Sequence, residues 1–165
     1  MGDGRCSKCD YMRVLVGLIS DTHGLVRPEV FRALDGVERI LHAGDVGDDV
    51  LIQLRAIAPV NAVFGNTDAP GTAGLVKSLH LEIAGLTVHV SHGHELGSPT
   101  PDKLIQHYDT DIIVFGHTHK PLVERPGRQL VVNPGAAGPR RFNLKPSVAR
   151  LTIVNGRADA AIVWL

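Results

Sequence analysis

The chain has 165 residues, 44% of them hydrophobic, and a formal net charge of zero, which fits one compact domain with a substantial core. Because no basic block and no aromatic residues interleaved with basic ones occur, we expect no stable binding to nucleic acid. No apolar run approaches the roughly 18 to 20 residues of a membrane span, and the first residues lack the pattern of a signal peptide. We therefore expect a cytoplasmic protein that is not associated with a membrane.

Residues 1–11 form a polar segment that we expect to be a disordered or frayed leader, followed by a single domain over residues 12–165. The leader contains the only cysteines, Cys6 and Cys9, in a Cys-x-x-Cys pair. Half of a zinc site and a redox pair are both open interpretations. However, no second Cys/His pair with zinc-finger spacing accompanies it, and it does not follow a strand. The pattern therefore favours a pair without a function.

The first half of the chain alternates apolar runs of strand length with short helical patterns, and the second half contains consecutive strands separated by turns. Strands are predicted at 13–19, 37–41, 59–64, 79–83, 86–90, 111–115, 122–125, 130–133, 148–154 and 158–164. Helices are predicted near 28–34, 48–57 and 101–108.

Five of these strands end in small residues that are followed by metal-binding residue types. In chain order these residues are Asp21 and His23, then Asp45, Asn66, the pair His92 and His94, and the pair His117 and His119. Residues two apart in an extended chain point to the same side. We therefore expect His117 and His119 to face one point just beyond their strand.

Most of these residues also have an ordinary structural interpretation. Asp21 could cap the next helix, and Gly65-Asn66 on its own indicates a turn. Asp45 could cap the helix near 48–57, but Asp48 serves that role equally well. His42 lies inside an apolar strand and is interpreted as a packed histidine rather than a ligand.

The shared position of these residues indicates one metal site. In open α/β sheets, sites lie beyond the carboxyl ends of the strands. Two aspartates, one asparagine and three or four histidines are too many ligands for one tetrahedral zinc ion, and they suit two ions with a bridging aspartate. Mixed imidazole and carboxylate ligands favour transition metals over calcium. Two such ions about 3.5 to 4 Å apart hold a bridging hydroxide for in-line attack on a phosphate ester.

The motifs are Asp21-x-His23, Gly44-Asp45, Gly65-Asn66, His92 and Gly116-His117-x-His119. In this order and spacing they resemble the calcineurin-like metallophosphoesterase superfamily, in its branch of small single-domain prokaryotic phosphodiesterases. The resemblance runs from about Met12 to the C-terminus. It implies a metallo-dependent phosphatase-like α/β (α+β) fold, a four-layer αββα sandwich of two facing mixed β-sheets flanked by helices. It also implies a dinuclear metal-dependent phosphodiesterase that hydrolyses a small phosphodiester or phosphoester, and small members often form homo-oligomers.

The resemblance also assigns the ligands. It implies one ion held by Asp21, His23 and His119, a second held by Asn66, His92 and His117, and Asp45 bridging the two. Manganese is the first expectation for both ions, and nickel, iron, zinc and cobalt are alternatives.

The chain departs from the family pattern after Asn66. Many family members have a histidine there that protonates the leaving group, whereas this chain has Thr67, which is no general acid near neutral pH. We expect His94 to take that catalytic role. Thr67, Arg140 and Arg141 are further candidates for substrate contacts, although the two arginines could equally be solvated.

Two other classes of function stay open. One retromer subunit resembles this fold, has lost key ligands and works as a non-catalytic scaffold. Seven intact ligand positions argue against that reading, because without metal they would bury unpaired polar groups. A regulatory or storage protein is disfavoured, since an asparagine and a bridging aspartate suit a labile, reactive site. Cyclic nucleotides, nucleic-acid ends and small diesters are all compatible as substrates.

Overall fold

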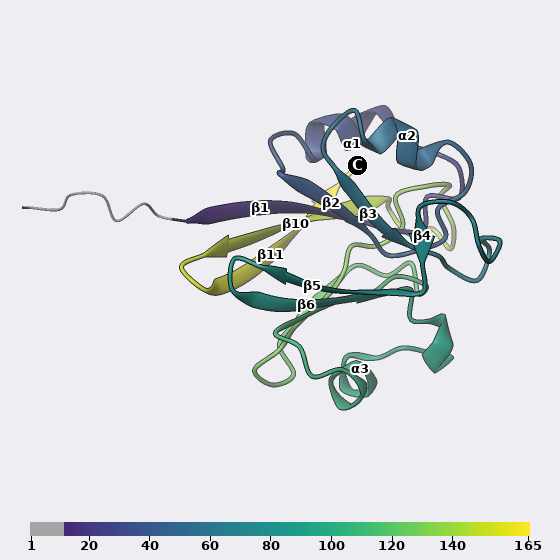
Figure 1. Ribbon diagram of the computed structural model, residues 1–165. Coiled ribbons are helices and arrows are strands. Elements are labelled where there is room, and N and C mark those ends of the chain that lie inside the picture. The colour runs from purple at the N-terminus through teal and green to yellow at the C-terminus, as the bar shows by residue number, and fades with distance from the viewer. Residues whose placement is uncertain (1–11) are drawn as a thin grey trace, which may run out of the picture.

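In the computed structural model, which describes residues 12–165, two mixed β-sheets face each other (Figure 1). The leader with Cys6 and Cys9 lies outside the described residues. The strands are β1 (Arg13–Ile19), β2 (Arg39–His42), β3 (Val60–Val63), β4 (Leu75–Val76), β5 (Ser78–Ile83), β6 (Leu86–Ser91), β7 (Ile112–Val114), β8 (Leu122–Glu124), β9 (Leu130–Asn133), β10 (Ser147–Val154) and β11 (Arg157–Trp164). The α-helices are α1 (Pro28–Ala33), α2 (Val50–Leu54) and α3 (Pro101–His107), and a short 3-10 helix covers His94–Leu96.

Both sheets combine parallel strands in the interior with antiparallel strands at an edge. The six-stranded sheet has the order β11-β10-β1-β2-β3-β4, in which β1 to β4 are parallel and β10 and β11 are antiparallel. The five-stranded sheet has the order β5-β6-β7-β9-β8, with β6, β7 and β9 parallel. Of the predicted strands, all were found, and only the two-residue β4 was not anticipated.

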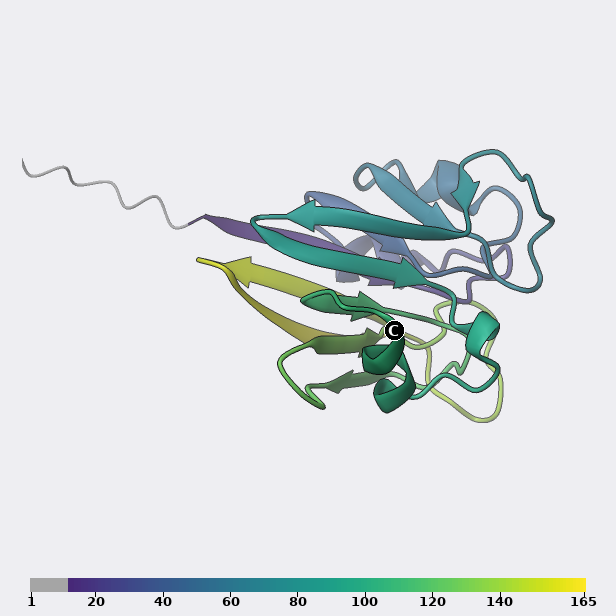
Figure 2. The same cartoon turned by 60° about the horizontal axis from the view of Figure 1, so that its bottom comes forward.

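Alternating side chains of each strand give the molecule its layers. In β1, Val16 and Leu18 point into the core between the sheets, whereas Ile19 packs under α1 and α2. In β7, Val114 points into the same central core and Ile113 packs toward α3. Figure 2, in which α3 comes forward, shows this helix on the outer side of the five-stranded sheet. The predicted αββα sandwich is confirmed.

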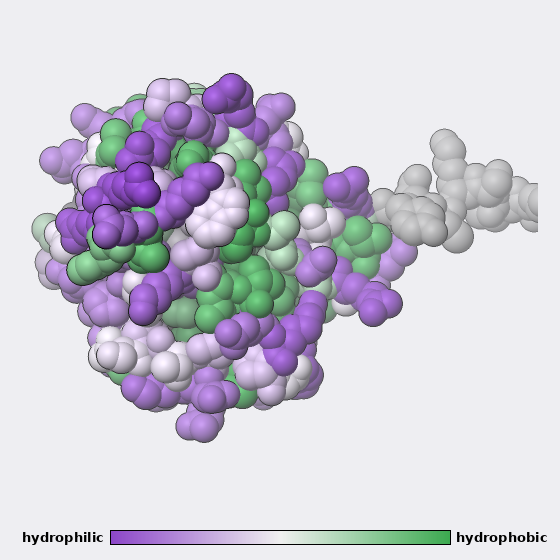
Figure 3. All heavy atoms as spheres, turned by 180° about the vertical axis from the view of Figure 1, so that it is seen from behind, coloured by the Kyte–Doolittle hydropathy of each residue, from purple (hydrophilic) through white to green (hydrophobic). Residues whose placement is uncertain are grey.

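The central core reaches the surface where the two sheets end at β11 and β8. Figure 3 shows a band of apolar residues across the middle of the back face, with hydrophilic residues above and below it. Val123 of β8 and Ala160 and Ile162 of β11 are partly buried against the core between the sheets. The edge strands therefore close the sandwich with small or branched apolar side chains.

The helices are shorter than the pattern suggested. α1 begins at Pro28, whose fixed φ suits the first turn of a helix. α2 covers only Val50–Leu54, because Asp49 before it has a left-handed backbone with φ 60° and no side chain caps the first turn. The expectation that Asp48 caps this helix is therefore wrong.

Two tight hairpins fix the end of the sandwich that lies opposite the predicted site. Ala84 and Gly85 have φ values of 49° and 80°, and Asn155 and Gly156 have values of 49° and 74°, as a type I′ turn requires. These turns adjoin the amino ends of β6 and β1. The carboxyl ends of the parallel strands lie at the other end, where the connecting loops are longer.

Among the helices of residues 12–165, none combines the length and the apolar character needed to cross a membrane.

His42, the last residue of β2, is a fully buried structural histidine. The Gly44 amide donates to its Nδ1 at 3.2 Å, and its Nε2 lies 2.8 Å from Thr22 Oγ1, which donates to the Val46 carbonyl at 2.7 Å. This arrangement requires a neutral ring that carries its hydrogen on Nε2. Burial lowers the pKa of His42 from 6.5 to about 4. The interpretation of His42 as a packed histidine agrees with this environment.

We predict that His42 makes the free energy of unfolding fall as the pH drops from 6.5 to about 4. In that window the unfolded chain binds more protons than the folded chain, so stability rises with pH and is lost on acidification. His42→Gln should flatten the dependence by up to about 3 kcal/mol. Urea unfolding of the metal-free protein at several pH values between about 4 and 6.5 measures this pH dependence. The exposed His107→Gln is the control, and an unchanged slope in His42→Gln would contradict the prediction.

Candidate metal centre

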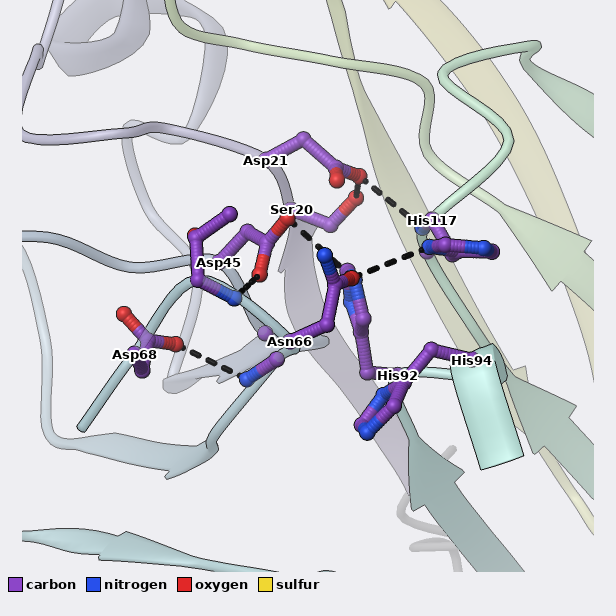
Figure 4. Close-up of polar contacts among 12 residues, drawn as sticks. Ser20, Asp21, Asp45, Asn66, Asp68, His92, His94 and His117 are labelled. Carbon is purple, nitrogen blue, oxygen red and sulfur yellow. Dashed lines mark hydrogen bonds and ion pairs between the residues drawn. The ribbon is translucent and has the colours of Figure 1, made fainter. Parts of the chain in front are cut away.

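The loops after five parallel strands meet at one end of the sandwich, and they bring all seven predicted metal ligands together. The six-stranded sheet contributes Asp21, His23, Asp45 and Asn66, and the five-stranded sheet contributes His92, His117 and His119. Figure 4 shows the side chains of Asp21, Asp45, Asn66, His92 and His117 pointing toward one another. Facing sheets thus place residues far apart in sequence around one small volume.

Five of the seven ligand positions have a left-handed backbone. Their φ values are 52° for Asp21, 46° for His23, 52° for Asp45, 68° for His117 and 59° for His119. Positive φ is uncommon for residues with a side chain, and clusters of it mark functional sites. The expectation that Asp21 and His23, and likewise His117 and His119, lie in extended chain is therefore wrong. Each of these two pairs lies in a turn directly after its strand.

The turn after β7 sends its two histidines to different partners. His117 Nδ1 lies 3.1 Å from Asn66 Oδ1, whereas His119 Nε2 lies 3.2 Å from Asp21 Oδ1. The geometric expectation that both rings face one point is therefore wrong. The division into two ligand groups is the one that the family resemblance implies.

The first group consists of Asp21, His23 and His119, which each offer a ligand atom within 4.8 Å of the others. Asp21 Oδ1 and His23 Nε2 are buried, and neither has a hydrogen-bond partner among the described residues. Burying such atoms without a partner is costly. Burial also lowers the pKa of His23, which favours the neutral ring that binds metals. This donor set fits a divalent transition-metal ion.

The second group is centred on Asn66. Its Oδ1 lies 3.1 Å from both His92 Nε2 and His117 Nδ1. His92 Nδ1 lies 2.7 Å from the carbonyl of Ala43 and therefore donates its hydrogen to it. This bond fixes the ring and leaves Nε2 to face the group, as in metal-binding histidines. One amide oxygen and two imidazole nitrogens thus converge.

Asp45 lies between the two groups. Its Oδ2 is 3.4 Å from His92 Nε2 and 3.8 Å from His23 Nε2, one nitrogen of each group. Its Oδ1 accepts the Thr67 amide at 2.9 Å. Burial raises the pKa of Asp45, but the nearby His92 ring and the hydrogen bond from the Thr67 amide outweigh it and hold the pKa well below its ordinary value. Asp45 is therefore an ionised carboxylate in a bridging position.

Glycines allow the ligand loops to approach this closely. A Cβ atom on Gly65 would lie 2.1 Å from Asp45 Oδ1, and one on Gly44 would lie 2.6 Å from His92 Nδ1. Both distances are too short for any side chain, so the glycines before Asp45 and Asn66 are needed for steric reasons.

Asp68 holds two ligand loops together, a role that the sequence pattern did not indicate. Its carboxylate accepts backbone amides from Val46 and Gly47, both at 3.0 Å, and from Gly65 at 2.8 Å. It therefore ties the loop that carries Asp45 to the loop that carries Asn66. The only signal in the sequence is an aspartate two residues after Asn66, which a turn would explain equally well.

The carboxylate of Asp21 is oriented in a similar way. Ser20 Oγ donates to Asp21 Oδ2, and the His117 amide donates to the same oxygen at 3.2 Å. These bonds leave Oδ1 free to face His119. Ser20 was another residue that the sequence did not single out.

The predicted acid lies beside the second ligand group, and the predicted substrate contacts are exposed loop residues. His94 opens the 3-10 helix, and its ring centroid lies 5.3 Å from that of His92 and 6.3 Å from that of His117. Thr67 is exposed and contributes its amide to Asp45. Arg140 and Arg141 are exposed in the loop after β9.

We predict that Asp68→Asn weakens metal binding without removing a ligand. An amide replaces a charged acceptor of three backbone N–H groups, so the loops that carry Asp45 and Asn66 lose their common anchor. Changes to groups that hold metal ligands typically cost about 10- to 100-fold in affinity. Calorimetric titration of metal-stripped protein with Mn²⁺ measures this, and Asp102→Asn, on the exposed face of α3, is the control. Unchanged Mn²⁺ affinity would refute the assigned role of Asp68.

Several known proteins resemble this chain in sequence or in fold. Residues 12–156 match the family model for the calcineurin-like phosphoesterase superfamily domain. The chain is 36% identical over 161 residues to a protein of Methanothermobacter thermautotrophicus named "Probable metallophosphoesterase", covering 91% of this chain and 92% of that protein. It is 27% identical over 139 residues to a phosphodiesterase of Methanocaldococcus jannaschii, covering 73% and 82%. Wild-type Vps29 of Entamoeba histolytica, solved in complex with Zn²⁺, matches with a TM-score of 0.74 at 25% identity, covering 92% of this chain and 99% of that one.

Proposed function

The chain belongs to the calcineurin-like phosphoesterase superfamily, and from that premise we propose that it is a dinuclear metal-dependent phosphodiesterase. The observation that supports two ions best is the position of Asp45. Its ionised carboxylate has one histidine nitrogen from each ligand group within 3.8 Å of a single oxygen atom. The preference for diesters is supported by the phosphodiesterase of Methanocaldococcus jannaschii among the relatives.

In this proposal the two ligand groups hold one ion each. Asp21, His23 and His119 would hold the first ion, Asn66, His92 and His117 the second, and Asp45 both. Mixed imidazole, amide and carboxylate donors support manganese, with nickel, iron, zinc and cobalt as alternatives. When bound, two such ions lower the pKa of water and neutralise charge on the phosphoryl group.

The protein's own contribution is to hold its ligands in one arrangement before the substrate arrives. The Thr67 amide holds Asp45 Oδ1, so that Oδ2 faces both groups. The Ala43 carbonyl holds His92 Nδ1, so that Nε2 points inward. Because these bonds lie largely within buried loops, little reorganisation is needed at the moment of reaction.

We propose that His94 gives a proton to the leaving oxygen. It lies beside His92 and His117, on the side of the second group. Its side chain is 30% exposed, so a substrate can reach it, and its Nδ1 lies 3.7 Å from Glu95 Oε2, which can orient the ring. Thr67, Arg140 and Arg141 are proposed as substrate contacts because all three are exposed. Thr67 directly follows Asn66, and Arg141 is close enough to His23 to lower its pKa.

A non-catalytic scaffold is the second candidate, because the chain resembles Vps29 over nearly its whole length. A scaffold would not need Asp21 Oδ1 and His23 Nε2 to be buried without a hydrogen bond to any described residue. The enzyme is therefore the better-supported proposal, and turnover separates the two.

We predict that Asp45→Ala removes metal-dependent turnover together with metal binding. Metal-stripped protein should hydrolyse bis(p-nitrophenyl) phosphate after Mn²⁺ is added, and faster than it hydrolyses the monoester. Losing the shared carboxylate should lower this rate by at least about a hundredfold. Asp35→Ala, an exposed position beyond α1, is the control. If the unmodified protein bound two ions but hydrolysed neither ester, this result would contradict the proposed enzyme and favour the scaffold.

We predict that His94→Ala slows the hydrolysis of poor leaving groups more than that of good ones, because only an alkoxide needs a proton. The loss should be about a hundredfold for a dinucleoside phosphate and much smaller for bis(p-nitrophenyl) phosphate. Metal content by mass spectrometry should stay the same as in the exposed control His80→Ala. An equal loss on both substrates would mean that His94 is not the acid.

A further inference from the structure

The loop 139–144 projects from a fixed base at the rim of the ligand groups. Before it, the amide of Gly138 donates to the carbonyl of Asp21 at 3.2 Å. The Gly138 carbonyl accepts from Nε and Nη2 of Arg27 at 3.2 and 3.1 Å. The base of the loop is therefore hydrogen-bonded to the backbone of Asp21, a predicted ligand, and this bond fixes the position of the base relative to the site.

Phe142, near the tip of this loop, is exposed in a way that folding alone does not favour. It is 81% exposed, more than any other large hydrophobic residue in the described part of the chain. Its φ is 54°, and that of Asn143 is 56°. A left-handed backbone at a bulky residue is a genuine outlier, and such outliers are held in place mainly where function requires them.

The position of Phe142 relates it to the site. Its ring centroid lies 6.3 Å from that of His119 with an angle of 66° between the planes, so the contact is edge-on. With so much of the side chain exposed, a face of the phenyl ring stays open to solvent beside a predicted ligand of the first group. Phe142 has no hydrogen-bonding group, and its open face can bind a planar partner by stacking.

Two arginines directly precede this phenylalanine in the same loop. Arg140 and Arg141 are both exposed, and within residues 12–165 neither has a carboxylate within ion-pair distance. Burial is the main cause of the lowered pKa of His23, and the positive charge of nearby Arg141 also lowers it. The loop beside the site therefore carries an open aromatic face and two arginines without an ion-pair partner among residues 12–165, of which Arg141 is close enough to act on His23.

We propose that the substrate is a small nucleoside phosphodiester whose base stacks on Phe142, an inference that rests on the proposed phosphodiesterase function. An aromatic face binds any base by stacking, and arginines supply the counter-charge for phosphate. A single platform fits one base rather than a strand, which agrees with the neutral net charge of the chain. Phe142 thereby becomes a specificity residue for the nucleoside and not for its leaving group.

Two p-nitrophenyl diesters with the same leaving group test this inference. One is the ester of thymidine monophosphate and the other that of methyl phosphate, so they differ in the nucleoside, which carries the base that would stack, and share the leaving group. Manganese-loaded protein should have a higher kcat/KM for the thymidine ester. Phe142→Ala should lower the thymidine-to-methyl ratio of kcat/KM about 5- to 20-fold, mainly through KM, and Phe142→Trp should preserve it.

Phe31→Ala is the matched control, because Phe31 is a 40% exposed phenylalanine on α1, and this variant should keep the ratio. Equal kcat/KM values for the two esters in the unmodified protein, or a ratio unchanged by Phe142→Ala, would overturn the stacking inference and leave the phosphodiesterase intact. Hydrolysis of neither ester would overturn both proposals.

Discussion

The structure depends on one electrostatic constraint, which is the concentration of ligand atoms around Asp45. Two aspartates, an asparagine and four histidines converge there, and atoms such as Asp21 Oδ1 and His23 Nε2 are buried without a hydrogen bond to any described residue. Such burial is unfavourable in a folded chain unless a cation compensates it. We infer that the fold tolerates this cost because metal binding repays it, since ligand groups arranged in advance bind ions without further ordering.

The rest of the architecture serves this arrangement. Parallel strands in two facing sheets direct their carboxyl ends to the same end of the sandwich, so that loops from both sheets share one volume. Gly44 and Gly65 allow the loops to approach, and Asp68 ties two of them together. The left-handed backbone of five ligand positions is the strain that remains. At this end of the molecule, the strained backbone lowers the stability of the fold but holds the ligands in their arrangement.

The sequence predicted the sheets well, because nearly continuous apolar runs of strand length, bounded by turn residues, identify strands that are buried on both faces. It also predicted which residues would lie together, since strand ends converge in such folds. It did not predict the left-handed turn that separates His117 from His119, which depends on packing between two sheets. Asp68 acts through backbone amides and Phe142 through its exposure, and neither property is visible in a residue pattern.

We propose that Asp45 bridges two metal ions. Diffraction from crystals of the manganese-loaded protein, measured at the manganese absorption edge, tests this bridge. We expect two anomalous peaks about 3.5 to 4 Å apart, with the carboxylate of Asp45 between them, one peak near His119 and the other near His117. A single peak, or two peaks with Asp45 bound to only one of them, would contradict the dinuclear centre.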